Sequence, residues 1–220
     1  LITDAPLKAL TVFAMPMILG SFFQQVYNMA DSIIVGQYVG APALAAVGAC
    51  AALTNVFICI ALGAGVGAGV LVSRYFGAKN YSKMKTIVST SLISFLILSV
   101  LLGIFGFCFS RFMMTALQTP ADILEEAVLY LRVYFVGFPF LFMYNIISTM
   151  FNSIGESKIP LGLLIFSSIL NIFMDIWMVA GLGLGVFGAA LATLIAQGIS
   201  AVFSLLIFFS RMRRYKSRFY

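Results

Sequence analysis

Histidine is absent from this sequence of 220 residues. Its absence excludes zinc sites with histidine ligands, serine–histidine–aspartate triads and proton relays through imidazole. Any group that takes up and releases protons must therefore be a carboxylate. The three cysteines, Cys50, Cys59 and Cys108, are an odd number without metal-ligand spacing, so we expect them to be buried as small apolar side chains.

Charged residues are also scarce. They make up 9% of the chain, whereas soluble domains carry about 25%, and apolar residues make up 62%. The mean hydropathy is +1.10, and apolar runs longer than about 18 residues recur along the whole chain. These features predict an integral membrane protein and are not explained by a signal peptide or a soluble core helix. No segment of about 10 residues alternates between apolar and polar positions, which favours helices over a barrel.

Six apolar segments are long enough to cross a bilayer, so we predict an all-α bundle of six transmembrane helices in a single lobe, residues 1–220. The predicted spans are residues 7–39, 43–76, 86–109, 123–152, 159–180 and 186–210. Leu1 stands where an initiator methionine would. We therefore expect the chain to be part of a longer polypeptide.

Basic residues indicate which side of the membrane each connection faces. Eleven of the 13 lie at the two ends of the chain, in residues 74–85 and at Lys158. An even number of predicted helices separates these segments from one another, so all of them lie on the same side of the membrane. Only Arg111 and Arg132 fall on the other side. The positive-inside rule therefore predicts that both ends are cytoplasmic. The net charge of +6 is a topology signal on this interpretation, and no nucleic-acid partner is expected.

The first predicted span contains a polar stretch, Gln24 to Asp31. Gln24, Asn28 and Asp31 share one face of a helix, with Tyr27 beside them. An ionised aspartate at the bilayer centre costs about 3 kcal/mol on insertion scales, so a carboxylate kept there indicates a function. The alternative is a structural role, in which Asn28 is the local hydrogen-bonding partner of Asp31.

A second deep carboxylate, Asp175, lies near the outer end of the fifth predicted span, at the same predicted depth as Asp31. Asn171 lies one turn before Asp175, and Thr193 lies about one turn into the sixth span. Carboxylate, amide and hydroxyl oxygens are ligands for hard cations, and two adjacent carboxylates can share a proton. These four residues could therefore converge on a site for a cation such as Na⁺, or for a proton. Arg132 could neutralise either acid, although its position near a helix end suits snorkelling better.

Further polar residues lie inside the spans. Asn145, Thr149 and Asn152 in the fourth span, and Gln197 in the sixth, are candidates for cavity lining or helix packing. Pro16 is expected to bend the first helix, because it removes a backbone hydrogen bond.

Glycines occupy positions 63, 65, 67 and 69 of the second span. Their two overlapping small-xxx-small pairs predict close approach of a neighbouring helix. The same run does not fit a phosphate-binding loop, because no strand precedes it and no Lys-Ser/Thr follows it.

Three segments together resemble the multidrug and toxic compound extrusion (MATE) transporters. Residues 28–36, NMADSIIVG, with Pro16 earlier in the same span, are similar to the first helix of that family. Residues 171–175, NIFMD, and residues 188–193, GAALAT, resemble its fifth and sixth helices. The resemblance extends over the whole chain.

The resemblance implies half of a transporter with twelve helices in two related lobes, which exports cationic or amphiphilic drugs in exchange for Na⁺ or H⁺. It implies that Asp31, Asn171, Asp175 and Thr193 form the cation site of the amino-terminal lobe and that Pro16 is a bend point. It also implies a multi-pass protein of the bacterial inner (plasma) membrane, with small-molecule drugs as substrates, no cofactor besides the coupling ion and no enzymatic activity. The second lobe, which alternating access requires, is absent from these residues.

The sequence also bears on three other functions. A flippase for lipid-linked oligosaccharides, of the same broad superfamily, would need Arg and Lys in its cavity for a pyrophosphate, and the spans contain almost none. An intramembrane aspartyl protease would carry a Gly-x-Gly-Asp motif, which is missing at Asp31 and at Asp175. A simple channel remains open at this stage, and saturable flux against a gradient would exclude it.

Overall fold

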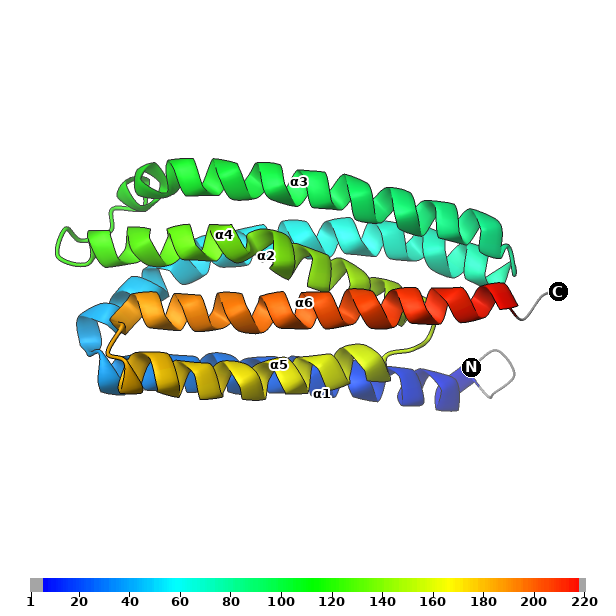
Figure 1. Ribbon diagram of the computed structural model, residues 1–220, viewed down its shortest axis with the longest axis horizontal. Coiled ribbons are helices and arrows are strands. Elements are labelled where there is room, and N and C mark those ends of the chain that lie inside the picture. The colour runs from blue at the N-terminus through cyan, green and yellow to red at the C-terminus, as the bar shows by residue number, and fades with distance from the viewer. Residues whose placement is uncertain (1–5, 218–220) are drawn as a thin grey trace.

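Residues 6–217 fold into six long helices and a short π-helical segment (Figure 1). The computed structural model describes residues 6–217, and it describes the side chains of residues 7–213 except Ala9. The elements are α1 (Pro6–Tyr38), α2 (Ala41–Gly77), α3 (Tyr81–Ala116), α4 (Leu124–Ser153), α5 (Lys158–Asp175), η1 (Ile176–Gly181) and α6 (Gly185–Ser217). Six helical segments are long and apolar enough to cross a membrane, and no strand occurs among the described residues. The predicted all-α membrane bundle is confirmed.

The helices extend beyond several predicted spans because polar residues continue them outside the bilayer. The third predicted span, residues 86–109, is the apolar middle of α3, which runs from Tyr81 to Ala116. Its start is fixed by Asn80, whose side chain accepts a hydrogen bond from the Lys83 N–H at 3.2 Å. The fifth predicted span, residues 159–180, divides into α5 and the π-helix η1.

Helix α4 lies at the centre of the bundle, where it packs against α2, α3 and α6. Its aromatic side chains fill the core: Phe135, Phe138 and Phe142 are almost completely buried. Phe57 of α2 meets the Phe135 ring edge-on, with 4.7 Å between the ring centroids. By contrast α1 packs mainly on α5, at the edge of the bundle (Figure 1), and none of the residues in its most apolar part is buried.

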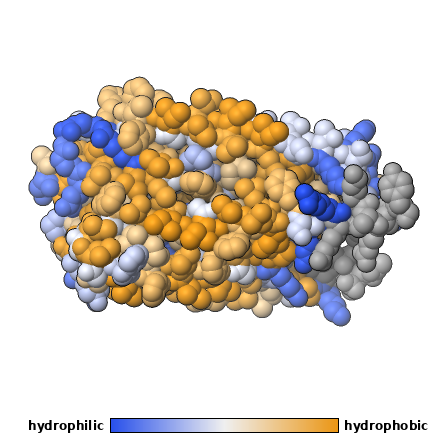
Figure 2. All heavy atoms as spheres, in the orientation of Figure 1, coloured by the Kyte–Doolittle hydropathy of each residue, from blue (hydrophilic) through white to orange (hydrophobic). Residues whose placement is uncertain are grey.

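The surface agrees with a membrane-spanning bundle. Figure 2 shows a broad hydrophobic belt with hydrophilic residues at both ends of the molecule. The two ends of the described chain lie at the same end of the bundle (Figure 1), as an even number of crossings requires. The side chains of Arg214 and Lys216, and Arg218 as a whole, lie outside the described part.

Alternate glycines of α2 divide between two environments. A Cβ at Gly65 or Gly69 would contact α4, since it would lie 3.0 Å from Thr149 Oγ1 or 2.6 Å from Ser153 Oγ, whereas a Cβ at Gly63 or Gly67 would meet nothing within 4 Å. The predicted close helix approach therefore holds for one pair only.

The expected burial of all three cysteines is wrong in part. Cys50 is buried, and its thiol donates to the Ala127 carbonyl oxygen at 3.3 Å. Cys59 and Cys108 are exposed. An apolar residue in a membrane helix can face lipid at no cost, so composition alone does not place it inside the bundle.

The two glycine pairs provide a matched test of packing. We expect Gly69→Leu to lower the thermal stability of the purified protein, because the new side chain must displace Ser153 and Thr149, and overpacking typically costs about 1–3 kcal/mol. Gly67→Leu adds the same side chain to open space and is expected to leave the melting temperature unchanged. Equal melting temperatures for the two variants would contradict the contact between α2 and α4.

A buried pair of aspartates between three helices

The end of α5 places two polar side chains in the interior. Asn171 and Asp175 lie one turn apart on the buried face of α5, and both are almost completely buried. The helix changes to π geometry directly after Asp175, where the Leu182 N–H donates to the Trp177 carbonyl oxygen at 3.0 Å. Single turns of π-helix often occur at functional sites. Gly183, with a φ of +65°, then allows the tight turn into α6.

Asp31 of α1 meets Asp175 of α5 in this interior. Asp31 is 9% exposed and Asp175 is fully buried. Their carboxyl groups face each other at a distance short enough for them to share a proton. With its nitrogen toward the carboxylate, the Asn171 amide donates to Asp175 Oδ2 at 2.9 Å, and its oxygen accepts from Thr193 Oγ1 at 3.2 Å. The structure therefore brings the four predicted residues together from α1, α5 and α6.

Within the part of the chain that the structure describes, the pair has no cationic partner. Among the described residues, no donor reaches Asp31 Oδ1 or Asp175 Oδ1, although both atoms are buried. Arg132, which could have neutralised an acid, is exposed between α3 and α4, and its Nε donates to Ser110 Oγ at 3.2 Å. Two buried carboxylates in contact cannot both be ionised without a large repulsion, unless a cation lies between them. The arrangement can therefore hold a proton or a small hard cation.

Tyrosines surround this pair. Tyr27, one turn before Asp31 on α1, is buried and lies beside Thr193. Tyr130 of α4 lies within electrostatic reach of Asp31 and Tyr27. Tyr130 was not among the residues predicted to form the site. The sequence contains a pattern that indicates it: Tyr130 and Tyr134 are four residues apart in a membrane span, so they share a helix face, and buried phenol groups need hydrogen-bonding partners.

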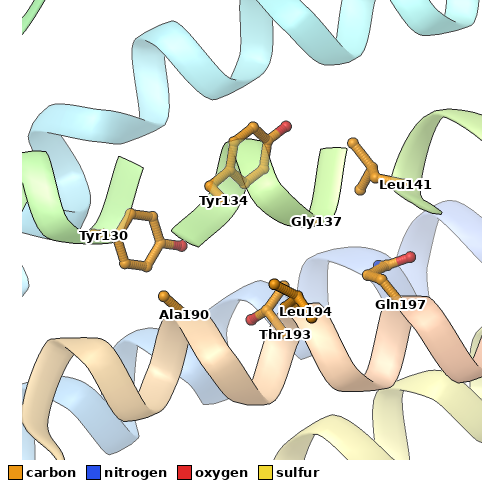
Figure 3. A pocket seen from close by; sticks show the side chains of 8 residues that line it. All are labelled: Tyr130, Tyr134, Gly137, Leu141, Ala190, Thr193, Leu194 and Gln197. Atoms are coloured by element: carbon orange, nitrogen blue, oxygen red, sulfur yellow. The ribbon is translucent and has the colours of Figure 1, made fainter. Parts of the chain in front are cut away.

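A small cavity adjoins the aspartate site between α4 and α6. Figure 3 shows Tyr130 and Thr193 facing it from opposite helices, with Gln197 farther along α6. Its volume of about 20 Å³ is close to the room that one water molecule needs. The cavity is lined by Tyr130, Tyr134, Gly137, Leu141, Ala190, Thr193, Leu194 and Gln197.

A larger cleft of about 490 Å³ opens beside α1. Most of the predicted cavity residues line it, namely Gln24, Asn28, Asn145, Thr149, Asn152 and Gln197, and Pro16 lies in its wall. Two of these side chains bond back to their own helix: Asn145 donates to the Leu141 oxygen at 2.8 Å and Thr149 to the Asn145 oxygen at 2.9 Å. Asn152 Oδ1 and Gln197 Oε1 are buried without a donor among the described residues.

Three expectations about α1 have different outcomes. Asn28 is exposed and lines the cleft, whereas Asp31 contacts Asp175, so the structure does not pair Asn28 with Asp31. Tyr27 turns toward Thr193 and does not line the cleft. Pro16 lies inside α1, which is continuous from Pro6 to Tyr38, and the bend at this residue stays a prediction.

Comparison with known proteins gives a consistent result. A protein-family model described as MatE matches residues 16–177. The chain is 30% identical over 216 residues to the "Probable multidrug resistance protein YoeA" of Bacillus subtilis, a match that covers 96% of this chain and 46% of that protein. It is also 30% identical over 205 residues to the multidrug export protein MepA of Staphylococcus aureus, covering 91% of this chain and 45% of that protein.

A solved structure matches the fold at similar coverage. It is described as the outward-facing conformation of a multidrug resistance MATE family transporter of the MOP superfamily. The TM-score is 0.90 at 29% identity, over 96% of this chain and 47% of that one. The chain thus spans about half the length of the proteins it matches.

Proposed function

Because this chain belongs to the MatE family, we propose that it is one lobe of a multidrug transporter, which expels amphiphilic or cationic compounds in exchange for Na⁺ or H⁺. The observation that carries the coupling is the contact between the buried carboxyl groups of Asp31 and Asp175. A cation that enters between them relieves their repulsion, and a proton does the same. One buried site can therefore be occupied by either ion.

The site joins the least packed helix to the rest of the lobe. Asp31 is on α1, whereas Asp175 and Thr193 are on α5 and α6. Few residues of α1 are buried, so few contacts fix α1 to the rest of the lobe. A change in the contact between Asp31 and Asp175 therefore affects a large share of these contacts. We propose that occupancy of the site changes the packing or the bend of α1 near Pro16, which lines the cleft, and so displaces the drug.

The cleft of about 490 Å³ is the proposed drug-binding surface of this lobe. Amides, hydroxyls and apolar side chains line it, and its lining contains no charged residue. This surface suits amphiphilic compounds that make a few hydrogen bonds. A flippase for lipid-linked oligosaccharides is less well supported, because a pyrophosphate needs Arg or Lys in the cavity.

Alternating access needs a second lobe, which rocks against this one about the cleft. The length of the matched proteins, about twice that of this chain, supports a second lobe in the same polypeptide. Six apolar helices imply a multi-pass membrane protein. The relatives from Bacillus and Staphylococcus support a bacterial plasma membrane as its location.

The test is transport by the complete polypeptide in proteoliposomes. We expect efflux of a cationic dye against its own gradient when an inward gradient of Na⁺ or of H⁺ is imposed. A membrane potential adds about 2.3 kcal/mol per charge per 100 mV to the driving force. Comparing a Na⁺ gradient at constant pH with a pH gradient without Na⁺ identifies the coupling ion. Dye flux that only dissipates its own gradient would contradict the proposal and indicate a channel.

A further inference from the structure

A second hollow lies between α3 and α4. It is a groove of about 340 Å³, and all of its lining residues are apolar. They are Val100, Gly103, Ile104, Phe107, Phe135, Val136 and Pro139. Helix α3 packs on α4 and α2, whereas the polar cleft is lined from α1, α2, α4, α5 and α6. The groove is therefore separate from the proposed drug-binding cleft.

Two local features form the groove. Pro139 has no N–H, so the Phe135 carbonyl oxygen one turn earlier lacks its usual helical partner. Gly103 lies against this oxygen: a Cβ at Gly103 would be 3.0 Å from it. Gly103 therefore lets α3 approach α4 closely at this point, and the groove opens beside this contact, where Ile104 of α3 and Val136 of α4 are exposed.

A cation lies at one end of this groove. On α4, Arg132 precedes Phe135 by three residues and Val136 by four, so it shares their face. Its guanidinium carbon is 5.5 Å from the centroid of the Phe107 ring, which lines the groove, and its Nε donates to Ser110 Oγ at 3.2 Å. The cation end points toward the connection between α3 and α4, away from both ends of the chain (Figure 1).

The charge of Arg132 is not balanced by a carboxylate in the described part of the chain. Among the described residues, Arg132 forms no ion pair. Glu125 lies two turns away on the same face of α4, but it pairs with Arg111 at 2.8 Å. Arg132 is exposed, and its remaining guanidinium N–H groups have no partner among the described residues, so they can bind an anion at the edge of the hydrophobic belt.

We propose that the groove between α3 and α4 is a binding site for a phospholipid of the outer leaflet. The phosphate binds the guanidinium of Arg132, and one acyl chain lies along the groove toward Pro139 and Val100. Charge complementarity selects the phosphate, and the apolar lining selects the chain. The proposal does not depend on what the protein transports.

The test measures lipid binding to the complete polypeptide by native mass spectrometry after removal of co-purified lipid. The probes are dioleoylphosphatidylglycerol and dioleoylglycerol, which have the same chains and differ in the phosphate-containing headgroup. We expect the phospholipid to bind about fivefold more tightly, the preference that one cation near the surface confers. Arg132→Gln should abolish this preference. Val136→Trp, which fills the groove from an exposed position, should weaken the binding of both lipids.

The matched control removes the other outer arginine without changing the net charge. Arg111→Gln/Glu125→Gln eliminates the neighbouring ion pair and should retain the full preference for the phospholipid. A preference that survives Arg132→Gln would overturn the proposal, because the phosphate would then bind elsewhere. Unchanged binding of both lipids to Val136→Trp would exclude the groove as the site of the acyl chain.

Discussion

Replacement of Asp31 by asparagine is expected to lower ion-coupled efflux at least about tenfold, which corresponds to the loss of about 1.4 kcal/mol of interaction. Asparagine fits the space of the carboxyl group and can hydrogen bond to Asp175, so the fold should persist. It can neither release a proton nor supply a negative charge to Na⁺. The measurement is dye efflux from proteoliposomes under an imposed ion gradient, normalised to the amount of reconstituted protein.

The control for Asp31→Asn is Asp122→Asn. Asp122 is exposed in the connection between α3 and α4, so its neutralisation should leave efflux unchanged. The two buried aspartates act as one unit if the proposal is correct. Asp175→Asn should then cause a similar loss, and the double variant should lose little more than either single variant. Efflux of Asp31→Asn at the wild-type level would refute its role in coupling.

Alanine at Gly106 is expected to give the largest loss of stability of any single added methyl group in this lobe. Its Cβ would overlap the ring of Phe135. That ring cannot move aside easily, because Phe135 is 1% exposed and packs against Phe57. Overpacking of a tight core typically costs about 1–3 kcal/mol, and an overlap of this size lies at the upper end.

The measurement is the melting temperature of the purified protein in detergent, followed by size-exclusion chromatography of heated samples. Gly162→Ala is the control, since a Cβ at Gly162 meets nothing within 4 Å and alanine favours the helix. The control should melt at the wild-type temperature or slightly above it. A Gly106→Ala variant that melts with the control would show that α3 and α4 are not in close contact at this point.

Much of the fold follows from the sequence, because the bilayer demands long apolar helices and the cytoplasmic side attracts basic residues. The convergence of Asp31 and Asp175 was predictable in part. A carboxylate inside a membrane span is energetically costly and therefore indicates a partner, and the two residues lie at the same predicted depth. The proximity of α1 to α5 and α6 could not be predicted in this way. It depends on which helices pack together, and an apolar surface that can face either lipid or protein does not encode that choice.

Other features escaped prediction for local reasons. Residues 176–181, IWMVAG, contain neither proline nor an early glycine, so nothing in them marks the change from α to π geometry after Asp175. Tyr130 resembled the many other aromatic residues of its span, because its importance comes from the approach of α1 and not from α4 itself. The two environments of the α2 glycines likewise depend on how α2 is rotated against α4.

The contact between Asp31 and Asp175 has a consequence for biosynthesis. The two residues are 175 − 31 = 144 positions apart, and synthesis at about 5–20 residues per second separates their appearance by roughly 7–30 s. For most of that interval α1 is complete, whereas the central helix α4 is finished only at Ser153 and α5, on which α1 packs, only at Asp175. The polar face of α1 therefore meets the insertion machinery before it meets its partners. Correct assembly of this lobe requires that α1 be held in the membrane until the fifth helix arrives.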